Sequence, residues 1–248
     1  MNGDYGSVDI LWLDGGWVRP ISDERARQMG RSFKGSPDID MGRIAAMARS
    51  YQPGLIVVER SVPGEFENYQ TPERGVPDGQ ITVPWESCIP LGNDWGYTHG
   101  DKYKSAPQVI HTLVEIVAKG GSLLLGIGPD ADGVLPDVVS NTLEQIGEWT
   151  NRNGEAIYNT VSHPVYNDGA TWFTQSKDGK IIYATVCREE GAPLPKTVIW
   201  KGHTPLSGAK MKFLHNGKTV KWKNTPDGIE VTLPSGTPAD IAALSFSF

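Results

Sequence analysis

The sequence has little positive charge and no long apolar run. Its 248 residues include 23 Lys and Arg against 29 Asp and Glu, which gives a net charge of -6. This acidic balance argues against nucleic acid as the main partner, because binding a phosphate backbone requires clustered basic residues. No stretch approaches the roughly 18 apolar residues of a membrane-spanning helix, so no membrane partner is expected. The first ten residues carry neither a basic nor an apolar signal-peptide region, and they leave the localisation open.

Residues that bind metals are also scarce. The two cysteines, Cys88 and Cys187, lie far apart, and no cluster of His, Cys and Asp has the spacing of a metal site. We therefore expect no metal and no other cofactor. What the sequence does contain is 38% hydrophobic residues and eight Trp, a composition typical of a folded protein with a substantial core.

Up to about Tyr158 the sequence alternates between apolar runs, which predict buried strands, and amphipathic segments, which predict helices. The predicted strands are "VDILWLD" (8–14), "LIVVER" (55–60), "VPWESC" (83–88) and "SLLLGIGP" (122–129), and the predicted helices are 38–54, 105–121 and 137–154. Strands that are apolar on both faces and separated by helices favour a parallel sheet covered by helices. The stretch 61–83 contains Pro and Gly but shows no periodicity.

The helices have recognisable ends and apolar faces. Asp40 is a candidate N-cap for the first helix, and Ser105 for the second. The residues expected to face the core are Ile44 and Met47 in the first helix, Val109, Ile110, Leu113, Val114 and Val117 in the second, and Leu143, Ile146 and Trp149 in the third.

After about Val165 the pattern changes to short alternating runs that are separated by Asp-Gly and Asn-Gly turns. Such runs predict antiparallel hairpins and a small β-sandwich. We therefore predict an α/β fold with two domains, a barrel-like domain over 1–162 and a β-sandwich over 163–248.

A carboxylate ends the first predicted strand, in "ILWLDGGWV". In a parallel α/β barrel, the residues at the carboxyl ends of strands face the active site, which would give Asp14 a functional role. An ordinary Asp-Gly turn, in which Asp14 only binds the backbone, explains the motif equally well.

Further acids follow in the next segments, and most acids on loops are simply solvated. These acids are Glu59, Glu65, Glu67, Glu73 and Glu86. Two carboxyl groups on converging strand ends are what glycoside hydrolysis requires. Aromatic residues crowd the same segments, where they either stack on sugar rings or fill the core; they are Trp12, Trp17, Tyr69, Trp85, Trp95 and Tyr97.

Several motifs together resemble glycoside hydrolase family 29, the retaining α-L-fucosidases. In order and spacing they are "YGSVDILWLDGGW", "ENYQTPER", "PWESC", "WGY", "YKSA", "GGSLLLGIGPDADG" and "IGEWTNRNGEAIYNT". The resemblance covers roughly residues 5–160, and a β-sandwich after it agrees with this family. It implies a (β/α) TIM-like barrel, of which about four strands are present here, followed by the sandwich.

The resemblance also implies roles for individual residues. Asp14 matches the nucleophile, and Glu73 in "TPE" matches the acid/base of several members, with Glu86 in "PWE" as its rival. Arg60 matches an arginine that contacts the fucose, and Trp95 matches an aromatic residue that packs on the methyl side of the sugar. We expect Glu73 on a mobile loop to be the acid/base, and Glu86, within an apolar run, to bind substrate.

Trp17 and Tyr69, which lie in the same segments, complete the predicted substrate-binding residues.

The sequence departs from the family in three places. Ser122 and Gly126 stand where the family has Asn, and Glu59 stands where it has Asp before the arginine. The family's earlier strands, which supply His and Trp to the fucose hydroxyls, have no match, and all five His lie downstream. About four strands are present where a closed barrel has eight. We therefore expect either a fragment or a half-barrel that associates into a homo-oligomer.

Three functions remain open at this point. The leading one is a retaining α-L-fucosidase that acts on fucosylated oligosaccharides or glycosides by double displacement. The second is a truncated fucosidase without turnover, acting as a sugar-binding or assembly module. The third is a retaining glycosidase of related shape that acts on another sugar.

Overall fold

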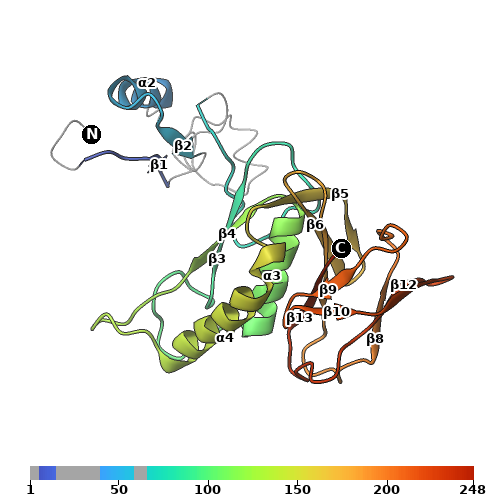
Figure 1. Cartoon of the computed structure of the whole chain (residues 1–248). Helices are drawn as coiled ribbons and strands as arrows, with labels where there is room; N and C mark the ends of the chain where they lie inside the picture. Colours follow the sequence, from blue (N-terminus) through green and yellow to red (C-terminus); the bar gives the residue numbers. More distant parts are fainter. Residues whose placement is uncertain (1–5, 15–39, 59–65) are drawn as a thin grey trace, which may run out of the picture. The chain divides into compact units, whose positions relative to one another are not determined.

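The computed structural model describes residues 6–14, 40–58 and 66–248 (Figure 1). The chain divides into two compact units, of which the first comprises residues 1–72 and 82–86 and the second residues 73–81 and 87–248. No helix in the described ranges is long and apolar enough to cross a membrane.

The first unit is built on parallel strand pairing. Its elements are β1 (Ile10–Trp12), α2 (Met41–Tyr51) and β2 (Ile56–Val58). The two strands pair in parallel, with Trp12 beside Val58. Isolated parallel bridges join Val58 to Tyr69 and Gln70 to Trp85. The parallel pairing that the sequence predicts is therefore present, although the strands are shorter than the apolar runs suggested.

Helix α2 begins at the predicted cap, and one of its two predicted core residues, Ile44, packs against the core of the first unit. The Asp40 side chain accepts a hydrogen bond from the backbone N–H of Arg43. The buried residues are Met41, Ala45 and Ala48, whereas Met47, which we expected in the core, is 57% exposed. Together with Ile44, the buried residues form the i, i+3, i+4, i+7 face of an amphipathic helix, and Met47 lies off that face.

The second unit begins with an α/β segment. Its elements are β3 (Glu86–Pro90, whose first residue belongs to the first unit), α3 (Ala106–Ala118), β4 (Ser122–Gly126), α4 (Asp137–Asn153) and the 3₁₀ turn η1 (Gly154–Ala156). β3 and β4 form a two-stranded sheet. Ser105 caps α3 as predicted: its hydroxyl accepts a hydrogen bond from the Gln108 N–H at 3.3 Å, and the Gln108 amide oxygen accepts one from the Ser105 N–H at 3.0 Å.

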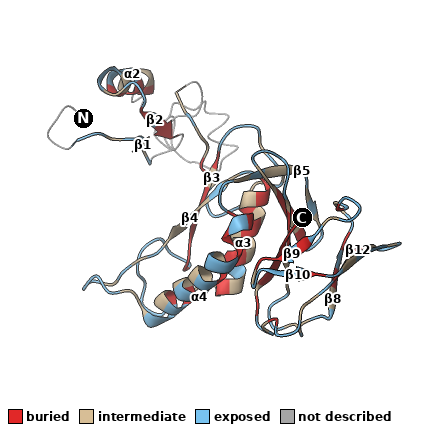
Figure 2. Cartoon of the chain, in the orientation of Figure 1, coloured by how far each residue is buried: buried red, intermediate tan, exposed pale blue. Residues whose placement is uncertain are grey.

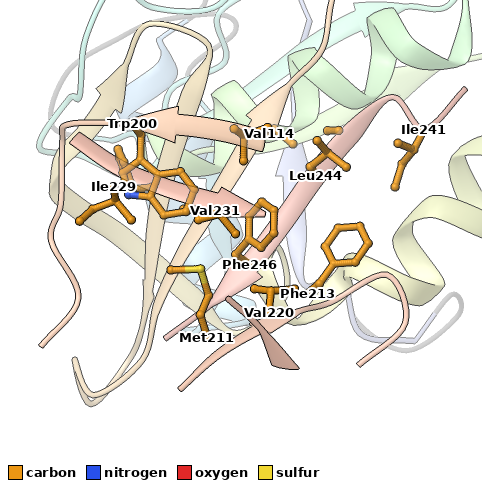
Figure 3. Packing of buried hydrophobic residues seen from close by; sticks show 14 of the residues in the cluster. Val114, Trp200, Met211, Phe213, Val220, Ile229, Val231, Ile241, Leu244 and Phe246 are labelled. Atoms are coloured by element: carbon orange, nitrogen blue, oxygen red, sulfur yellow. The ribbon is translucent and has the colours of Figure 1, made fainter. Parts of the chain in front are cut away.

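The rest of the second unit is the predicted β-sandwich. Its strands are β5 (Thr160–Asp168), β6 (Thr171–Ser176), β7 (Ile182–Cys187), β8 (Thr197–Trp200), β9 (Met211–Phe213), β10 (Lys218–Val220), β11 (Trp222–Thr225), β12 (Gly228–Thr232) and β13 (Ala243–Ser247). One sheet has the order β10-β9-β13-β7-β6-β5 and the other β11-β12-β8, and the neighbours pair antiparallel. Trp200 and Val231 of the smaller sheet pack in one core with Phe213 and Phe246 of the larger one (Figure 3). This shared core confirms the sandwich.

The helices belong to the same compact unit as the sandwich. Ile110 and Val114 of α3 and Trp149 of α4 lie in the sandwich core, and the Trp149 indole N–H donates a hydrogen bond to the Ala243 carbonyl at 3.0 Å. The apolar faces expected for α3 and α4 are therefore confirmed. The domain boundary at 162/163 stays a prediction, and it falls within this unit.

Of the strands expected to be buried, β3 is buried along most of its length, whereas β1 and β4 expose alternate residues (Figure 2). In β4, Leu123 and Leu125 pack in a cluster with the helices, whereas Leu124 is 45% exposed. Successive side chains of a strand point to opposite faces, so the helices of the unit cover only one face of β4. Parallel pairing in the described ranges is confined to small sheets, and these ranges do not form a closed barrel.

Candidate functional site

Asp14 lies at the edge where the parallel strands of the first unit end. It follows β1 by two residues and is exposed. The carboxyl ends of parallel strands share one edge of the sheet, and Val58, the last residue of β2, pairs with both Trp12 and Tyr69 at that edge. Tyr69, a predicted substrate-binding residue, is therefore on the same edge as the predicted nucleophile.

Glu86 lies at the same position along the parallel strands as Asp14 does. The Gln70 N–H donates to the Pro84 carbonyl at 3.0 Å, and the Glu86 N–H donates to the Gln70 carbonyl at 2.9 Å. Because Gln70 pairs with Trp85, the next residues, Thr71 and Glu86, lie beside each other. Thr71 follows Tyr69 by two positions, and Asp14 likewise follows Trp12 by two. The structure thus brings Asp14, Tyr69 and Glu86 to one edge of the first unit.

The surroundings of Glu86 suit a proton donor. Its side chain is half-buried, and this burial raises its pKa above the usual value of a glutamate. Burial also raises the pKa of Tyr69, and the negative charge of Glu86 raises it further. A carboxyl group whose pKa is raised holds its proton at higher pH, which general acid catalysis requires.

Glu73 lies in the second unit, in an irregular stretch as expected, but it is tied to a strand. It forms a parallel bridge with Cys88 of β3, and the N–H of the next residue, Arg74, donates to the Cys88 carbonyl at 2.9 Å. The Glu73 side chain is exposed. Isolated residue pairs among Pro and Gly leave no periodic pattern in the sequence, which is why 61–83 was expected to be irregular throughout.

Trp95 lies on a braced loop that follows β3. The Asp101 carboxylate accepts hydrogen bonds from the N–H groups of Asn93 at 3.0 Å and of Lys102 at 2.7 Å. The Lys104 ammonium donates to the Pro90 carbonyl at 2.6 Å, which ties the end of the loop to β3. Trp95 is 39% exposed, so part of its ring is available to a ligand.

Arg74 was not predicted as a site residue, although it stands in the quoted "TPER" motif. Its guanidinium lies over the Trp95 ring, 5.1 Å from the ring centroid. Stacking of a cation on an aromatic ring is a tertiary contact, and the sequence alone does not show which arginine stacks on which ring. The remaining predicted site residues, Arg60 and Trp17, lie outside the described residues.

Metal ligands do not gather in the part of the chain that the structure describes. Within those ranges there is no group of three or more His, Cys, Asp or Glu side chains placed to hold a metal ion. The groups identified above are the carboxylates of Asp14 and Glu86 in the first unit and the stacked Arg74 and Trp95 in the second. Carboxylates and aromatic rings are side chains that sugar-cleaving sites use.

Comparison with known proteins agrees with this chemistry. The family described as alpha-L-fucosidase matches residues 1–155. The plasma alpha-L-fucosidase of Rattus norvegicus is 32% identical over 67% of this chain and 38% of its own length, and that of Homo sapiens is 31% identical over 68% and 38%. Among solved structures, alpha-L-fucosidase isoenzyme 1 of Paenibacillus thiaminolyticus has a TM-score of 0.76 at 25% identity, covering 99% of this chain and 58% of that one.

The strand-edge carboxylates and the sandwich thus occur in a chain with the fold of known glycosidases. This chain belongs to the alpha-L-fucosidase family. It spans about two fifths of the length of the curated relatives that it matches.

Proposed function

We propose that this chain is the catalytic segment of a retaining α-L-fucosidase that releases L-fucose from fucosylated oligosaccharides or glycosides. The family match over residues 1–155 carries the proposal. The position of Asp14 at the carboxyl edge of parallel strands supports it independently, because catalytic groups of barrel enzymes lie at such edges.

The proposed reaction has two displacements. The Asp14 carboxylate attacks the anomeric carbon and forms a fucosyl ester while the acid/base donates its proton to the departing oxygen. The acid/base then takes a proton from water, which displaces Asp14 and releases fucose. Two inversions restore the original configuration at the anomeric carbon.

The acid/base has two candidates. We assign this role to Glu73 because it occupies the matching position in the "TPE" motif. Glu86 is the second candidate, favoured by its raised pKa and by its level in the strand register with Asp14. If Glu73 is the acid/base, Glu86 orients or binds the substrate.

The proposed substrate-binding residues surround these carboxylates in the sequence. Arg60 would contact fucose hydroxyls, Trp95 would pack on the apolar methyl side of the sugar, and Trp17 and Tyr69 would supply further aromatic surface. The strands of the family-matched part are proposed to form about half of a TIM-like barrel, and the uncovered faces of such a half-barrel favour a homo-oligomer.

The test is the stereochemistry of turnover. The purified 248-residue chain is incubated with an aryl α-L-fucoside, and proton NMR follows the first sugar released. We expect α-L-fucose first, and loss of activity in Asp14→Ala but not in Asp9→Ala, which removes an exposed carboxylate just before the same strand. Initial release of β-L-fucose would contradict the double displacement.

Two other outcomes would select the other functions. L-Fucose binding without turnover would identify a sugar-binding module. Faster hydrolysis of another aryl glycoside than of the fucoside would identify a glycosidase for a different sugar.

A further inference from the structure

The Trp95 ring packs against the backbone of Gly126. Gly126 ends β4 and stands where the family motif has Asn. A Cβ atom at this position would lie 3.0 Å from Cε3 and 3.1 Å from Cζ3 of Trp95. Contacts this short are tighter than nine in ten real Cβ contacts, so a side chain at 126 requires the ring to shift by a few tenths of an ångström. The absence of a side chain at 126 therefore allows the Trp95 ring to lie this close to the end of β4.

Arg74, from a separate segment of the chain, also contacts the Trp95 ring. Besides stacking on Trp95, its guanidinium donates a hydrogen bond to the Asn93 carbonyl at 2.7 Å. Its backbone is in the left-handed region, with φ of 57°, and its N–H is bonded to β3. Non-glycine residues adopt this conformation rarely, and they persist in it where the surroundings hold them. Arg74 is thus anchored through its backbone and its side chain.

A second glycine, Gly128, packs against the backbone that follows Trp95. A Cβ at Gly128 would lie 2.4 Å from the Tyr97 backbone nitrogen and 2.6 Å from the Gly96 carbonyl carbon. The "GIGP" sequence of 126–129 therefore accepts both the Trp95 ring and the chain that follows it. Close packing against these glycines therefore holds the loop at the end of β4, while the Asp101 hydrogen bonds brace the loop internally.

We infer that Gly126 and Arg74 are positioning residues that hold the Trp95 ring where it selects a sugar with an apolar methyl group at C6. This inference rests on the proposed function and deepens it. A ring in this position packs on the methyl of L-fucose, whereas the hydroxymethyl of L-galactose brings a hydroxyl that loses water without gaining a partner. Apolar surfaces reject an added hydroxyl by up to about a hundredfold, so the expected preference is moderate.

The position of the ring is tested first, without turnover. The full chain is labelled with 5-fluorotryptophan, and the ¹⁹F resonance of Trp95 is assigned by its loss in Trp95→Phe. Gly126→Ala and Arg74→Gln should each move this resonance. Gly147→Ala, the same change in α4 with no atom within 4 Å of the added carbon, should leave it in place. An unmoved Trp95 resonance in both site variants overturns the positioning role.

Selectivity is tested next by titrating the same resonance with L-fucose and with L-galactose. The unmodified chain should respond to L-fucose at lower concentration than to L-galactose, and this preference should shrink roughly three- to tenfold in Gly126→Ala and Arg74→Gln. An unchanged preference, or no response of Trp95 to either sugar, overturns the inference about C6.

The catalytic proposal fails separately from this inference. Absence of turnover with an intact fucose response refutes the fucosidase activity and leaves the role of Gly126 and Arg74 in sugar binding. Where turnover exists, both variants should raise KM for the aryl fucoside more than they lower kcat, because the ring binds the sugar and does not react with it.

Discussion

At the scale of single residues, the candidate site contains two glutamates whose surroundings differ. Glu86 is half-buried at the start of β3, whereas Glu73 is exposed beside Cys88. The motif match favours Glu73 as acid/base, and the electrostatics favour Glu86. Mechanism can separate the two, because an acid/base and a binding residue respond differently when a small nucleophile replaces water.

Azide is the nucleophile that makes this separation. If Glu73 is the acid/base, Glu73→Ala should lose most activity on natural glycosides but still form the fucosyl ester from substrates with good leaving groups. Azide should then accelerate turnover and give α-fucosyl azide, because it needs no general base. Glu86→Ala should show no such rescue. Asp14→Gly serves as the stereochemical control, since direct displacement by azide there gives the β-azide. Rescue in Glu86→Ala alone would transfer the role to Glu86.

The raised pKa of Glu86 makes a prediction about stability. A carboxyl group whose pKa is raised by folding binds its proton more tightly in the folded state, so its contribution to stability is largest at low pH and is lost as pH rises through the folded pKa. Glu86→Gln removes the buried charge at neutral pH. We expect this variant to have a higher Tm than the unmodified chain at pH 7, and a smaller difference near pH 4.

Calorimetry at the two pH values measures this difference. Glu144→Gln, which neutralises an exposed carboxylate on α4, is the control and should change Tm little at either pH. A Tm difference for Glu86→Gln that grows as pH falls would contradict the assigned direction of the pKa shift.

At the scale of elements, helix α3 is attached to the segment 73–81 by a buried lysine. The Lys119 side chain is 6% exposed, and its ammonium donates to the Pro77 carbonyl and to the Glu115 carboxylate, each at 2.6 Å. It also lies 5.7 Å from the centroid of the Trp172 ring in β6. Lys119 therefore connects α3 with the residues next to Glu73 and with the sandwich.

Removing this ammonium should destabilise the chain measurably. Lys119→Met keeps the apolar stem but removes the ammonium that donates to a partly buried carbonyl and a partly buried carboxylate, at a cost of about 1.5–3 kcal/mol in the free energy of unfolding. Lys180→Met is the matched control, because its ammonium is exposed and its pairing with Asp178 at 3.3 Å lies on the surface. Surface pairs contribute about 0–1 kcal/mol, so equal losses in urea unfolding of the two variants would contradict the account.

The elements also show which features the sequence could predict. Local signals were sufficient for the caps at Asp40 and Ser105, because a cap is satisfied by residues three positions away. Local signals also predicted the Asp-Gly and Asn-Gly hairpins: Gly179 and Gly217, for example, have φ of 69° and 70° at such turns. Each of these features depends on a few neighbouring residues.

Features that depend on distant residues were missed or wrong. Met47 of α2 was expected in the core because it is apolar, but it is 57% exposed, whereas Ile44 of the same helix does pack in the core. The pairing of Glu73 with Cys88 and the stacking of Arg74 on Trp95 join separate segments through single contacts, which leave no periodic pattern. Asp14 was a candidate from its place at the end of a predicted strand, but an ordinary Asp-Gly turn explained it equally well until the family resemblance implied a role for it.

At the scale of the whole molecule, the second unit exposes apolar residues in β4 and in the segment that follows it. Leu124, Ile127 and Val134 are 45%, 38% and 58% exposed. A parallel strand of a barrel has both faces covered, so we propose that a second copy of the chain covers this surface. Covering ~800 Å² of apolar area would contribute roughly 20 kcal/mol before the costs of association.

Sedimentation equilibrium at micromolar concentration tests this assembly. We expect a dimer or larger species, and a shift toward monomer in Leu124→Glu. Leu206→Glu, which adds the same charge at an 84% exposed position, should leave the mass unchanged. A stable monomer with full fucosidase activity would refute both the assembly and the need for a complete barrel.

The central claim is that Asp14 becomes covalently bound to fucose, and trapping that ester tests it most directly. The chain is incubated with 2-deoxy-2-fluoro-L-fucosyl fluoride, whose fluorine slows hydrolysis of the ester, and is then digested and analysed by mass spectrometry. We predict one added 2-fluorofucosyl group on the peptide that contains Asp14, and none in Asp14→Ala. A label on another residue, or an unlabelled chain that still hydrolyses aryl α-L-fucosides, would contradict the account.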